Sequence, residues 1–142
     1  MTALEIRRPE SSEAAQLFEL AQDFTTSFRA DFSAFSRSLG FLLRDTDCDL
    51  LCAYDESQMT GYILAFSHLS FFANGPVSWV EELYVRPESR RRGIAAALMQ
   101  AVESRARDRG VHLIALATRR AGEFYAAIGY EESAVYYRRV LD

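Results

Sequence analysis

The chain has 142 residues, of which 49% are hydrophobic and 25% charged, and its formal net charge is −4. This length and composition favour one globular domain whose core needs no metal or disulfide cross-link. No apolar run reaches the roughly 18 to 20 residues that span a membrane, and the first residues lack an export pattern, so we expect a cytoplasmic protein.

The amino-terminal third predicts a short strand followed by two amphipathic helices. Residues 4–8 alternate as a strand, and Ser11 or Ser12 can cap the helix that follows. Apolar residues three and four apart form a stripe in each helix: Ala14, Leu17, Phe18, Ala21, Phe24 and Phe28 in the first, and Phe32, Phe35, Leu39, Leu42 and Leu43 in the second, expected over 31–44. We interpret both stripes as core, although such phenylalanines can also line a substrate pocket.

The middle of the chain predicts three strands. Residues 49–54 and 60–69 flank the polar turn at 55–58 and so indicate a hairpin. Asn74-Gly75-Pro76 marks a second turn before an apolar strand over 79–85.

The two cysteines are interpreted as structural residues. Cys48 and Cys52 share a predicted strand, which would place their α-carbons roughly 13 Å apart, beyond the reach of a disulfide. His68 and His112 stand alone in the sequence. No metal site is expected, because further ligands are missing near the cysteines.

The last third predicts two helices and two strands. A helix runs from Gly93 to Gly110, where glycine can end it. Residues 111–117 form a near-continuous apolar run typical of a strand covered on both faces, and a helix is expected over 121–128. Residues 131–141 alternate enough for a terminal strand.

The loop before the long helix has the composition of an anion-binding cradle. Three arginines, residues 90–92, precede Gly93, and the first turn of a helix offers free N–H groups to an anion. The loop lacks the Gly-Lys-Ser/Thr ending of a P-loop and the three glycines of a dinucleotide-binding turn. Nucleic acid is not expected as a partner, because the net charge is negative and the arginines occupy one loop. An ordinary solvated loop is the alternative interpretation.

This loop resembles the arginine/glutamine-x-x-glycine-x-glycine/alanine signature of the GNAT superfamily of acyl-CoA-dependent N-acetyltransferases, with Ala95 in the last position. Ala121 followed by residues 124–130 is similar to the late helix of that family, which carries a tyrosine and ends on glycine and an aromatic residue. The resemblance implies an α/β, single-domain GNAT-like fold over residues 1–142. Its sheet would be mixed and mostly antiparallel, with six to seven strands and about four helices on both faces.

The resemblance also implies acetyl-CoA as co-substrate. The main chain at 83–85 would hold its pantetheine arm, with one N–H polarising the thioester oxygen, and the N–H groups from 91 to 95 would bind its pyrophosphate. The family's asparagine seven residues before the tyrosine is a threonine here, which puts that contact in doubt. The residues expected to contact acetyl-CoA are Leu83, Tyr84, Val85, Arg90, Arg91, Arg92, Gly93, Ile94, Ala95, Thr118, Phe124 and Tyr125.

Tyr125 is the predicted general acid. A phenol with an unperturbed pKa of about 10 stays protonated at neutral pH and can protonate a departing thiolate. The resemblance implies this role, because the matching tyrosine of the family lies beside the cofactor sulfur. The alternative is that Phe124 and Tyr125 anchor the helix by packing alone.

Glu81 and Glu82 are the candidate catalytic bases, because packing does not call for carboxylates in an apolar strand. Strict alternation places Glu81 on the side of Trp79 and Leu83. It places Glu82 on the opposite side with Val80, unless a bulge intervenes. We favour Glu81 as the base and the other carboxylate as an attractor of cationic substrates. An exposed or ion-paired glutamate is the alternative for each.

These features predict an enzyme that transfers an acetyl group directly to a primary amine, with a small cationic metabolite as acceptor. A covalent acetyl-enzyme is disfavoured, because neither cysteine adjoins a motif. A protein or peptide amine and an inactive acyl-CoA-binding sensor remain alternatives. Relatives that pair through terminal strands make a homodimer a further expectation.

Overall fold

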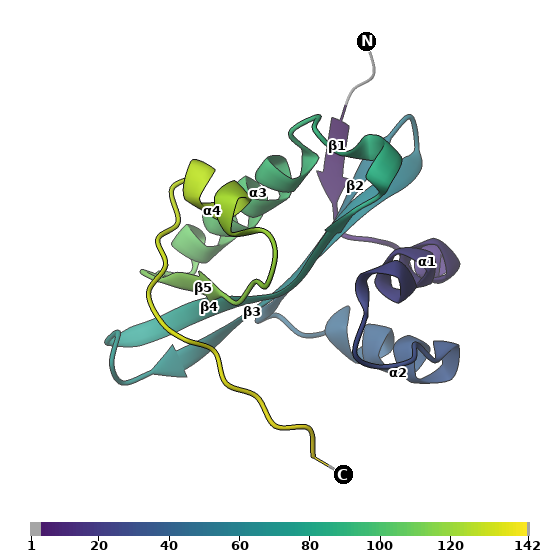
Figure 1. Cartoon of the computed structure of the whole chain (residues 1–142). Helices are drawn as coiled ribbons and strands as arrows, with labels where there is room; N and C mark the ends of the chain where they lie inside the picture. Colours follow the sequence, from purple (N-terminus) through teal and green to yellow (C-terminus); the bar gives the residue numbers. More distant parts are fainter. Residues whose placement is uncertain (1–3, 142) are drawn as a thin grey trace.

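The computed structural model describes residues 4–141 and places one five-stranded sheet between two pairs of helices (Figure 1). The strands are β1 (Leu4–Arg7), β2 (Cys48–Asp55), β3 (Gln58–Ser70), β4 (Gly75–Val85) and β5 (Ile114–Leu116). The helices are α1 (Ala14–Phe24), α2 (Phe32–Leu42), α3 (Ile94–Asp108) and α4 (Gly122–Ala127), with short 3-10 turns at Ser11–Glu13 and Pro87–Ser89. Strands β1 to β4 are antiparallel neighbours and β5 joins β4 in parallel, which confirms the mixed, mostly antiparallel sheet.

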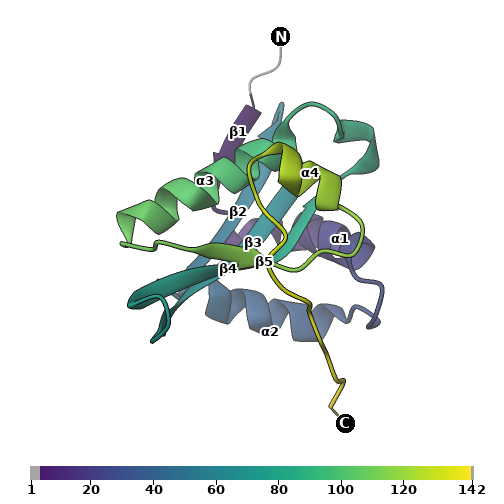
Figure 2. The same cartoon turned by 60° about the vertical axis from the view of Figure 1, so that its left-hand side comes forward.

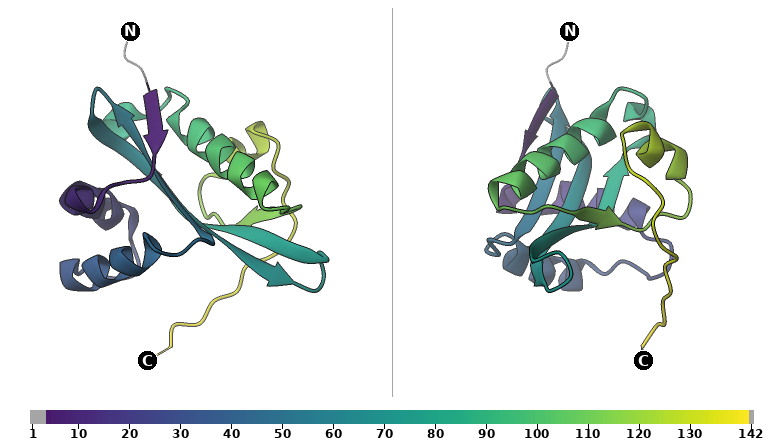
Figure 3. Two further views of the ribbon diagram at one scale, coloured as in Figure 1. Left: turned by 180° about the vertical axis from the view of Figure 1, so that it is seen from behind. Right: turned by 90° about the vertical axis from the view of Figure 1, so that its left-hand side faces the viewer.

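The sheet is a central layer that is covered on both faces, as expected. The left panel of Figure 3 shows it nearly edge-on, with α1 and α2 on one side and α3 and α4 on the other. Alternate residues of β2 therefore enter different cores, because side chains of a strand point to opposite faces. The core beneath α3 includes Leu51, Ala53, Ile63, Ala65, Val80, Val85, Leu98, Met99 and Val102, and the core beneath α1 and α2 includes Leu17, Leu20, Leu39, Leu50, Cys52, Tyr54, Met59 and Tyr62.

The prediction of six to seven strands is wrong for the described residues, which form five. The segment 131–141, expected as a terminal strand, has no regular secondary structure, and β5 has three residues instead of the seven expected over 111–117. Figure 2 shows the carboxy-terminal segment running past β5 and away from the sheet. Alternating side chains favour a strand, but a strand forms only where a neighbour completes its hydrogen-bond ladder.

The start of the first helix also differs from expectation. Glu10 and Glu13 form a reciprocal capping box at this point, in place of a cap by Ser11 or Ser12. Helix α1 ends at Phe24, so Phe28 lies beyond it and is exposed. A glutamate pair can take over the capping role because carboxylate oxygens accept backbone N–H groups as hydroxyl oxygens do.

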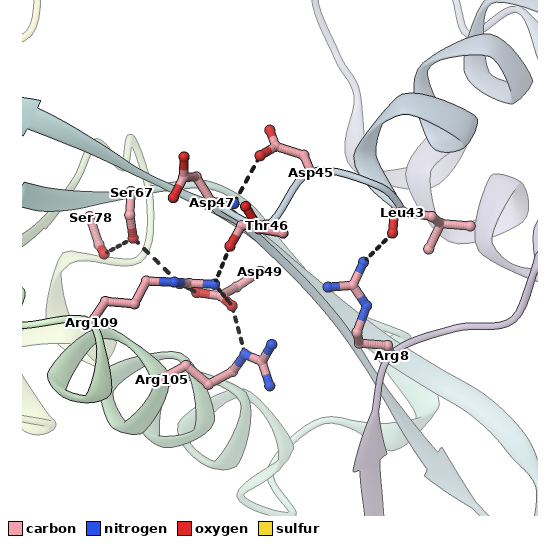
Figure 4. A network of polar contacts seen from close by, with 10 residues as sticks. All are labelled: Arg8, Leu43, Asp45, Thr46, Asp47, Asp49, Ser67, Ser78, Arg105 and Arg109. Carbon is pink, nitrogen blue, oxygen red and sulfur yellow. Dashed lines mark hydrogen bonds and ion pairs between the residues drawn. The ribbon is translucent and has the colours of Figure 1, made fainter.

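A buried carboxylate fastens α3 to the sheet (Figure 4). Asp49 on β2 is only 1% exposed and accepts hydrogen bonds from Arg105, at 2.6 Å from Nε, and from Arg109. The Arg109 guanidinium also donates to the carbonyl of Thr46, 3.0 Å away. Two arginines one helical turn apart thus satisfy a charge that would be costly to bury alone.

Both cysteines lie on β2, as predicted, and both are fully buried with free thiols. Burial raises the pKa of the Cys48 thiol to about 11 and that of the Cys52 thiol to about 12. Thiolates are the reactive form of cysteine, so neither side chain is poised as a nucleophile. No helix within residues 4–141 has both the length and the apolar character needed to cross a membrane.

Candidate active site

A β-bulge at Glu81 shapes the site. Leu64 of β3 pairs with Glu82, whereas the next residue, Ala65, pairs with Val80, so Glu81 is the extra residue of β4. A bulge bends its strand and re-aims the side chains that follow. Glu81 is exposed there.

The bulge overturns the strict alternation expected along β4. Val80 and Leu83 both pack against the core beneath α3, although they lie three residues apart. Glu82 and Tyr84 face the other side of the sheet, where Glu82 meets a residue of the α1–α2 core. Val80 and Glu82 therefore lie on opposite faces of the sheet, because Glu81 between them has no pairing partner on β3.

Strands β4 and β5 part at this point. Strand β5 pairs with β4 only along Ser78 to Val80, so within residues 4–141 the outer edge of β4 has no strand partner from Glu81 onward. The backbone of Leu83, Tyr84 and Val85 is paired with β3 on its inner side alone. An unpaired strand edge can bind an extended ligand as an added strand would, which is the geometry expected for a pantetheine arm.

A cavity of about 120 Å³ opens where the two strands part. Helix α1 contributes one wall and the β5–α4 segment another, and the bulge of β4 lies between them. The cavity brings together five of the predicted site residues, Glu81, Glu82, Leu83, Thr118 and Tyr125, from two distant parts of the chain. It is lined by Phe24, Val80, Glu81, Glu82, Leu83, Leu116, Ala117, Thr118, Ala121 and Tyr125.

Glu82 is the partly buried carboxylate of the cavity. The hydroxyl of Tyr62 donates a hydrogen bond to Glu82 Oε1 at 2.7 Å. Burial raises the pKa of the Glu82 carboxyl, the Tyr62 hydrogen bond opposes this rise, and the nearby charge of Glu81 adds to it. The result is a carboxylate that holds protons more strongly than a solvent-exposed glutamate does.

Tyr125 of α4 also lines the cavity. Its ring packs edge-on against Phe124 at 4.9 Å and against Tyr130 at 5.9 Å between centroids. Burial raises the pKa of the Tyr125 phenol, which keeps it protonated at neutral pH. Thr118 Oγ1 accepts a hydrogen bond from the backbone N–H of Ala121 at 3.0 Å, so this hydroxyl caps the start of α4 while the residue lines the cavity.

The predicted cradle has the backbone of an anion site. Arg91 and Gly93 both have left-handed conformations, with φ of 65° and 77°, and α3 begins at Ile94 without a side-chain cap. A Cβ added at Gly93 would meet nothing within 4 Å, so the space beside these amides is open. The N–H groups of the first turn, through Ala95, are therefore available to a diphosphate.

The three arginines of the cradle differ in their surroundings. Arg90 Nε donates to the carbonyl of Val85 at 2.9 Å, and Arg92 lies 3.5 Å from Asp55. Arg91 is exposed at the turn. Positive charge thus remains near the amides even though two of the side chains already contact protein groups. The residues present fit the diphosphate of acetyl-CoA.

The sequence analysis missed one residue of this region, Tyr62, and left the role of another, Phe24, open between core and pocket lining. Tyr62 carries no signal of its own, since its partner becomes apparent only once β3 and β4 are placed in register. Phe24 was interpreted as core, and pocket lining was the alternative for that stripe. The structure places Phe24 in both settings, beside the α1–α2 core and in the cavity wall.

Comparisons of the sequence with protein-family models and with curated proteins both point to the same family. The model of the family described as "Acetyltransferase (GNAT) family" matches residues 14–130. An aminoglycoside N(6')-acetyltransferase type 1 from Acinetobacter genomosp. 13 is 33% identical over 108 residues, which cover 69% of this chain and 74% of that protein.

Solved structures share the same fold. A transcriptional regulator from Bacillus halodurans C-125 has a TM-score of 0.89 at 19% identity, with 98% of this chain and 100% of that one covered. An aminoglycoside N-acetyltransferase in complex with CoA has a TM-score of 0.84 at 20% identity, with 98% and 96% covered. At these identities the structural matches show the fold alone. The acetyltransferase family is shown by the family model and by the relative from Acinetobacter.

Proposed function

The chain belongs to the GNAT family of N-acetyltransferases, whose acyl donor is acetyl-CoA, and from that premise we propose that it acetylates a primary amine of a small cationic metabolite by direct transfer. The observation that carries the proposal is the cavity between β4 and β5. Two carboxylates, Glu81 and Glu82, and the phenol of Tyr125 line this one cavity and supply a base and an acid there.

Acetyl-CoA supplies a thioester whose carbonyl carbon is open to attack by an uncharged amine. A carboxylate of β4 takes one proton from the substrate ammonium, and the freed nitrogen forms a C–N bond as the C–S bond breaks. The Tyr125 hydroxyl gives its proton to the departing sulfur. The acetylated nitrogen loses its second proton to solvent as the neutral amide forms, and the Tyr125 phenolate regains a proton from solvent. A backbone N–H at 83–85 polarises the thioester oxygen. Direct attack is favoured because both cysteine thiols are buried.

The chain's own groups would hold acetyl-CoA at two places. The free edge of β4 at Leu83 to Val85 suits the pantetheine amides, and the amides around Gly93 suit the diphosphate. Thr118 lies at the cavity where the arm would end.

The charge of the cavity supports a cationic acceptor. Among the described residues, its lining includes Glu81 and Glu82 and no lysine, arginine or histidine. A space of about 120 Å³ suits the aminomethyl end of a metabolite better than a folded peptide. The relative from Acinetobacter is named for an aminoglycoside, a class of polycationic amino sugars, so we place amino sugars first among candidate acceptors.

An acceptor screen tests the proposal. The purified chain is incubated with acetyl-CoA and a panel of aminoglycosides, amino sugars, polyamines and amino-terminal peptides, and free thiol release is followed. We expect the highest kcat/KM with a polycationic small amine. Preference for peptides would favour the protein-acetylating alternative, and acetyl-CoA binding without turnover of any amine would favour a sensor.

We also propose that residues 131–141 join two copies of the chain. This extended segment exposes Val135, Tyr137 and Leu141, and β5 ends the sheet beside it. An unpaired extended arm next to an open strand edge can pair with the same arm of a second molecule. Light scattering of the full chain should give twice the monomer mass, and Val135→Glu with Tyr137→Glu should give the monomer mass. A monomer at all concentrations would contradict the proposal.

A further inference from the structure

The two glutamates at the cavity differ in how they are held. Glu81 is the bulge residue and is exposed. Glu82 turns toward the α1–α2 side of the sheet, where a buried tyrosine hydroxyl contacts one of its oxygens at 2.7 Å. A base must be held at a defined angle to a substrate nitrogen, and only Glu82 has such a restraint.

We propose that Glu82 is the base that accepts the proton of the acceptor amine and that Tyr62 is the positioning residue that orients it. This inference rests on the proposed acetyl transfer and reverses the sequence-based preference for Glu81. In the reaction Glu82 gains the proton that the ammonium loses, and it returns that proton to solvent after the C–N bond has formed.

Tyr62 acts through Glu82 and does not touch substrate. It lies on β3, is 2% exposed and does not line the cavity. Its ring packs against Phe24 with 6.4 Å between centroids and an interplanar angle of 72°, which fixes the direction of its hydroxyl. Because Tyr62 occupies Oε1 of Glu82, the second oxygen, Oε2, is left for the amine.

Within residues 4–141, the group that hydrogen-bonds to Glu82 is the neutral hydroxyl of Tyr62, and no cationic side chain contributes to its pKa shift. Burial and the charge of Glu81 raise the pKa of Glu82, and the hydrogen bond from Tyr62 lowers it. Loss of the Tyr62 hydroxyl should therefore raise the pKa of Glu82 further and keep the base protonated to higher pH. The titratable groups nearest to it are Tyr62 on β3, Glu81 and Tyr84 on β4 and Tyr125 on α4, while α1 presents the apolar Phe24.

The test is Tyr62→Phe, which removes the hydroxyl and keeps the ring. The acidic limb of the pH profile of kcat/KM should move to higher pH, with activity recovered at alkaline pH. The same direction should appear without any substrate in a ¹³C NMR titration of protein labelled at glutamate carboxyls, with the Glu82 signal identified by its loss in Glu82→Gln. The matched control is Tyr54→Phe, since Tyr54 is also buried and its hydroxyl also contacts a glutamate, Glu13 at 2.9 Å, away from the cavity.

The outcomes separate this inference from the proposed function. Glu82→Gln should lower kcat/KM by about 100-fold or more and abolish the acidic limb, whereas Glu81→Gln should retain the limb. An NMR midpoint that Tyr62→Phe leaves in place, or that Tyr54→Phe moves equally, would overturn the role of Tyr62. If no amine is acetylated, the proposed function and the base fail together, yet the NMR titration still decides whether Tyr62 controls the Glu82 carboxyl.

Discussion

At the scale of single residues, burial moves the ionisable groups of the cavity in directions that suit acid–base transfer. The pKa of Glu82 rises, which strengthens it as a proton acceptor once it is ionised. The pKa of Tyr125 also rises, which keeps the phenol protonated. Activity should therefore increase as Glu82 ionises and decline only when the pH approaches the raised pKa of Tyr125.

Tyr125→Phe tests the acid. The variant keeps the aromatic ring that packs against Phe124 and loses the proton donor. We expect kcat to fall by about 100-fold or more, the usual contribution of a general acid, with acetyl-CoA affinity unchanged by calorimetry. Tyr130→Phe is the matched control, because its hydroxyl contacts Glu103 at 2.6 Å and it does not line the cavity. Equal turnover by the Tyr125 variant would show that another group protonates the sulfur.

At the scale of elements, the two ends of α3 offer a paired test of the cradle. Gly93 before the helix and Gly110 after it have nearly the same φ, 77° and 78°, and a Cβ at either would meet nothing within 4 Å. Gly93→Val and Gly110→Val should each lower the free energy of unfolding by about 1–2 kcal/mol, the cost of a left-handed backbone for such a residue.

Only Gly93→Val should weaken acetyl-CoA binding. The added methyl groups would cover the amides of the first helical turn and remove at least one hydrogen bond to an anion, worth about tenfold in affinity. Calorimetric titration of both variants with acetyl-CoA measures the difference. Equal affinity in the two variants would place the diphosphate elsewhere.

The Asp49 cluster provides a prediction about how α3 is attached to β2. Asp49→Asn removes the charge that two arginines share and leaves Arg105 and Arg109 facing each other across a neutral amide. We expect a loss of about 3 kcal/mol in the free energy of unfolding, measured by denaturant titration. Asp47 is exposed in the same segment, so Asp47→Asn should change the free energy of unfolding by no more than about 0.5 kcal/mol. Similar losses in both variants would contradict a special role for Asp49.

Sequence patterns predicted the elements that are determined by residues close together in the chain. The hairpin at 55–58, the start of α3 after Gly93 and the apolar stripe of α3 follow from turn chemistry and periodicity, and the structure confirms each. The bulge at Glu81 depends on the register between two strands, which no single strand encodes. The prediction of a strand over 131–141 was wrong for the same reason, because a strand needs a neighbouring strand to pair with and the segment's own sequence does not specify one.

At the scale of the whole molecule, the two parts of β4 before and after the bulge have different surroundings. From Ser78 to Val80 it is paired on both sides and lies within the sheet. Beyond the bulge, within residues 4–141, it is paired only with β3, so its other edge is free. Strand β4 is thus paired on both sides before the bulge, while its backbone groups after the bulge remain available on one edge. The acyl donor and the carboxylates can then meet without a large change of fold.

The amino-terminal corner of the molecule predicts how stability depends on pH. Glu13 joins β1 to β2 and α1, because Arg7 donates to both of its carboxylate oxygens at 3.0 and 3.1 Å and Tyr54 donates at 2.9 Å. The Arg7 hydrogen bonds lower the pKa of Glu13 from 4.5 to about 2. A lowered pKa in the folded state stabilises the protein at pH values above 4.5, and this contribution is lost as the pH falls toward 2.

Glu13→Gln should therefore lower the free energy of unfolding at neutral pH by about 1 kcal/mol, a modest value because Arg7 is partly exposed to solvent. The difference from the unmodified chain should shrink between pH 4.5 and 2, since the carboxyl of the unmodified chain becomes protonated over that range. Denaturant titrations at several pH values measure this. Glu19→Gln removes an exposed ion pair with Arg86 and should leave the pH dependence as it is. A constant difference between the Glu13 variant and the unmodified chain down to pH 2 would mean that Glu13 acts by packing and not by its charge.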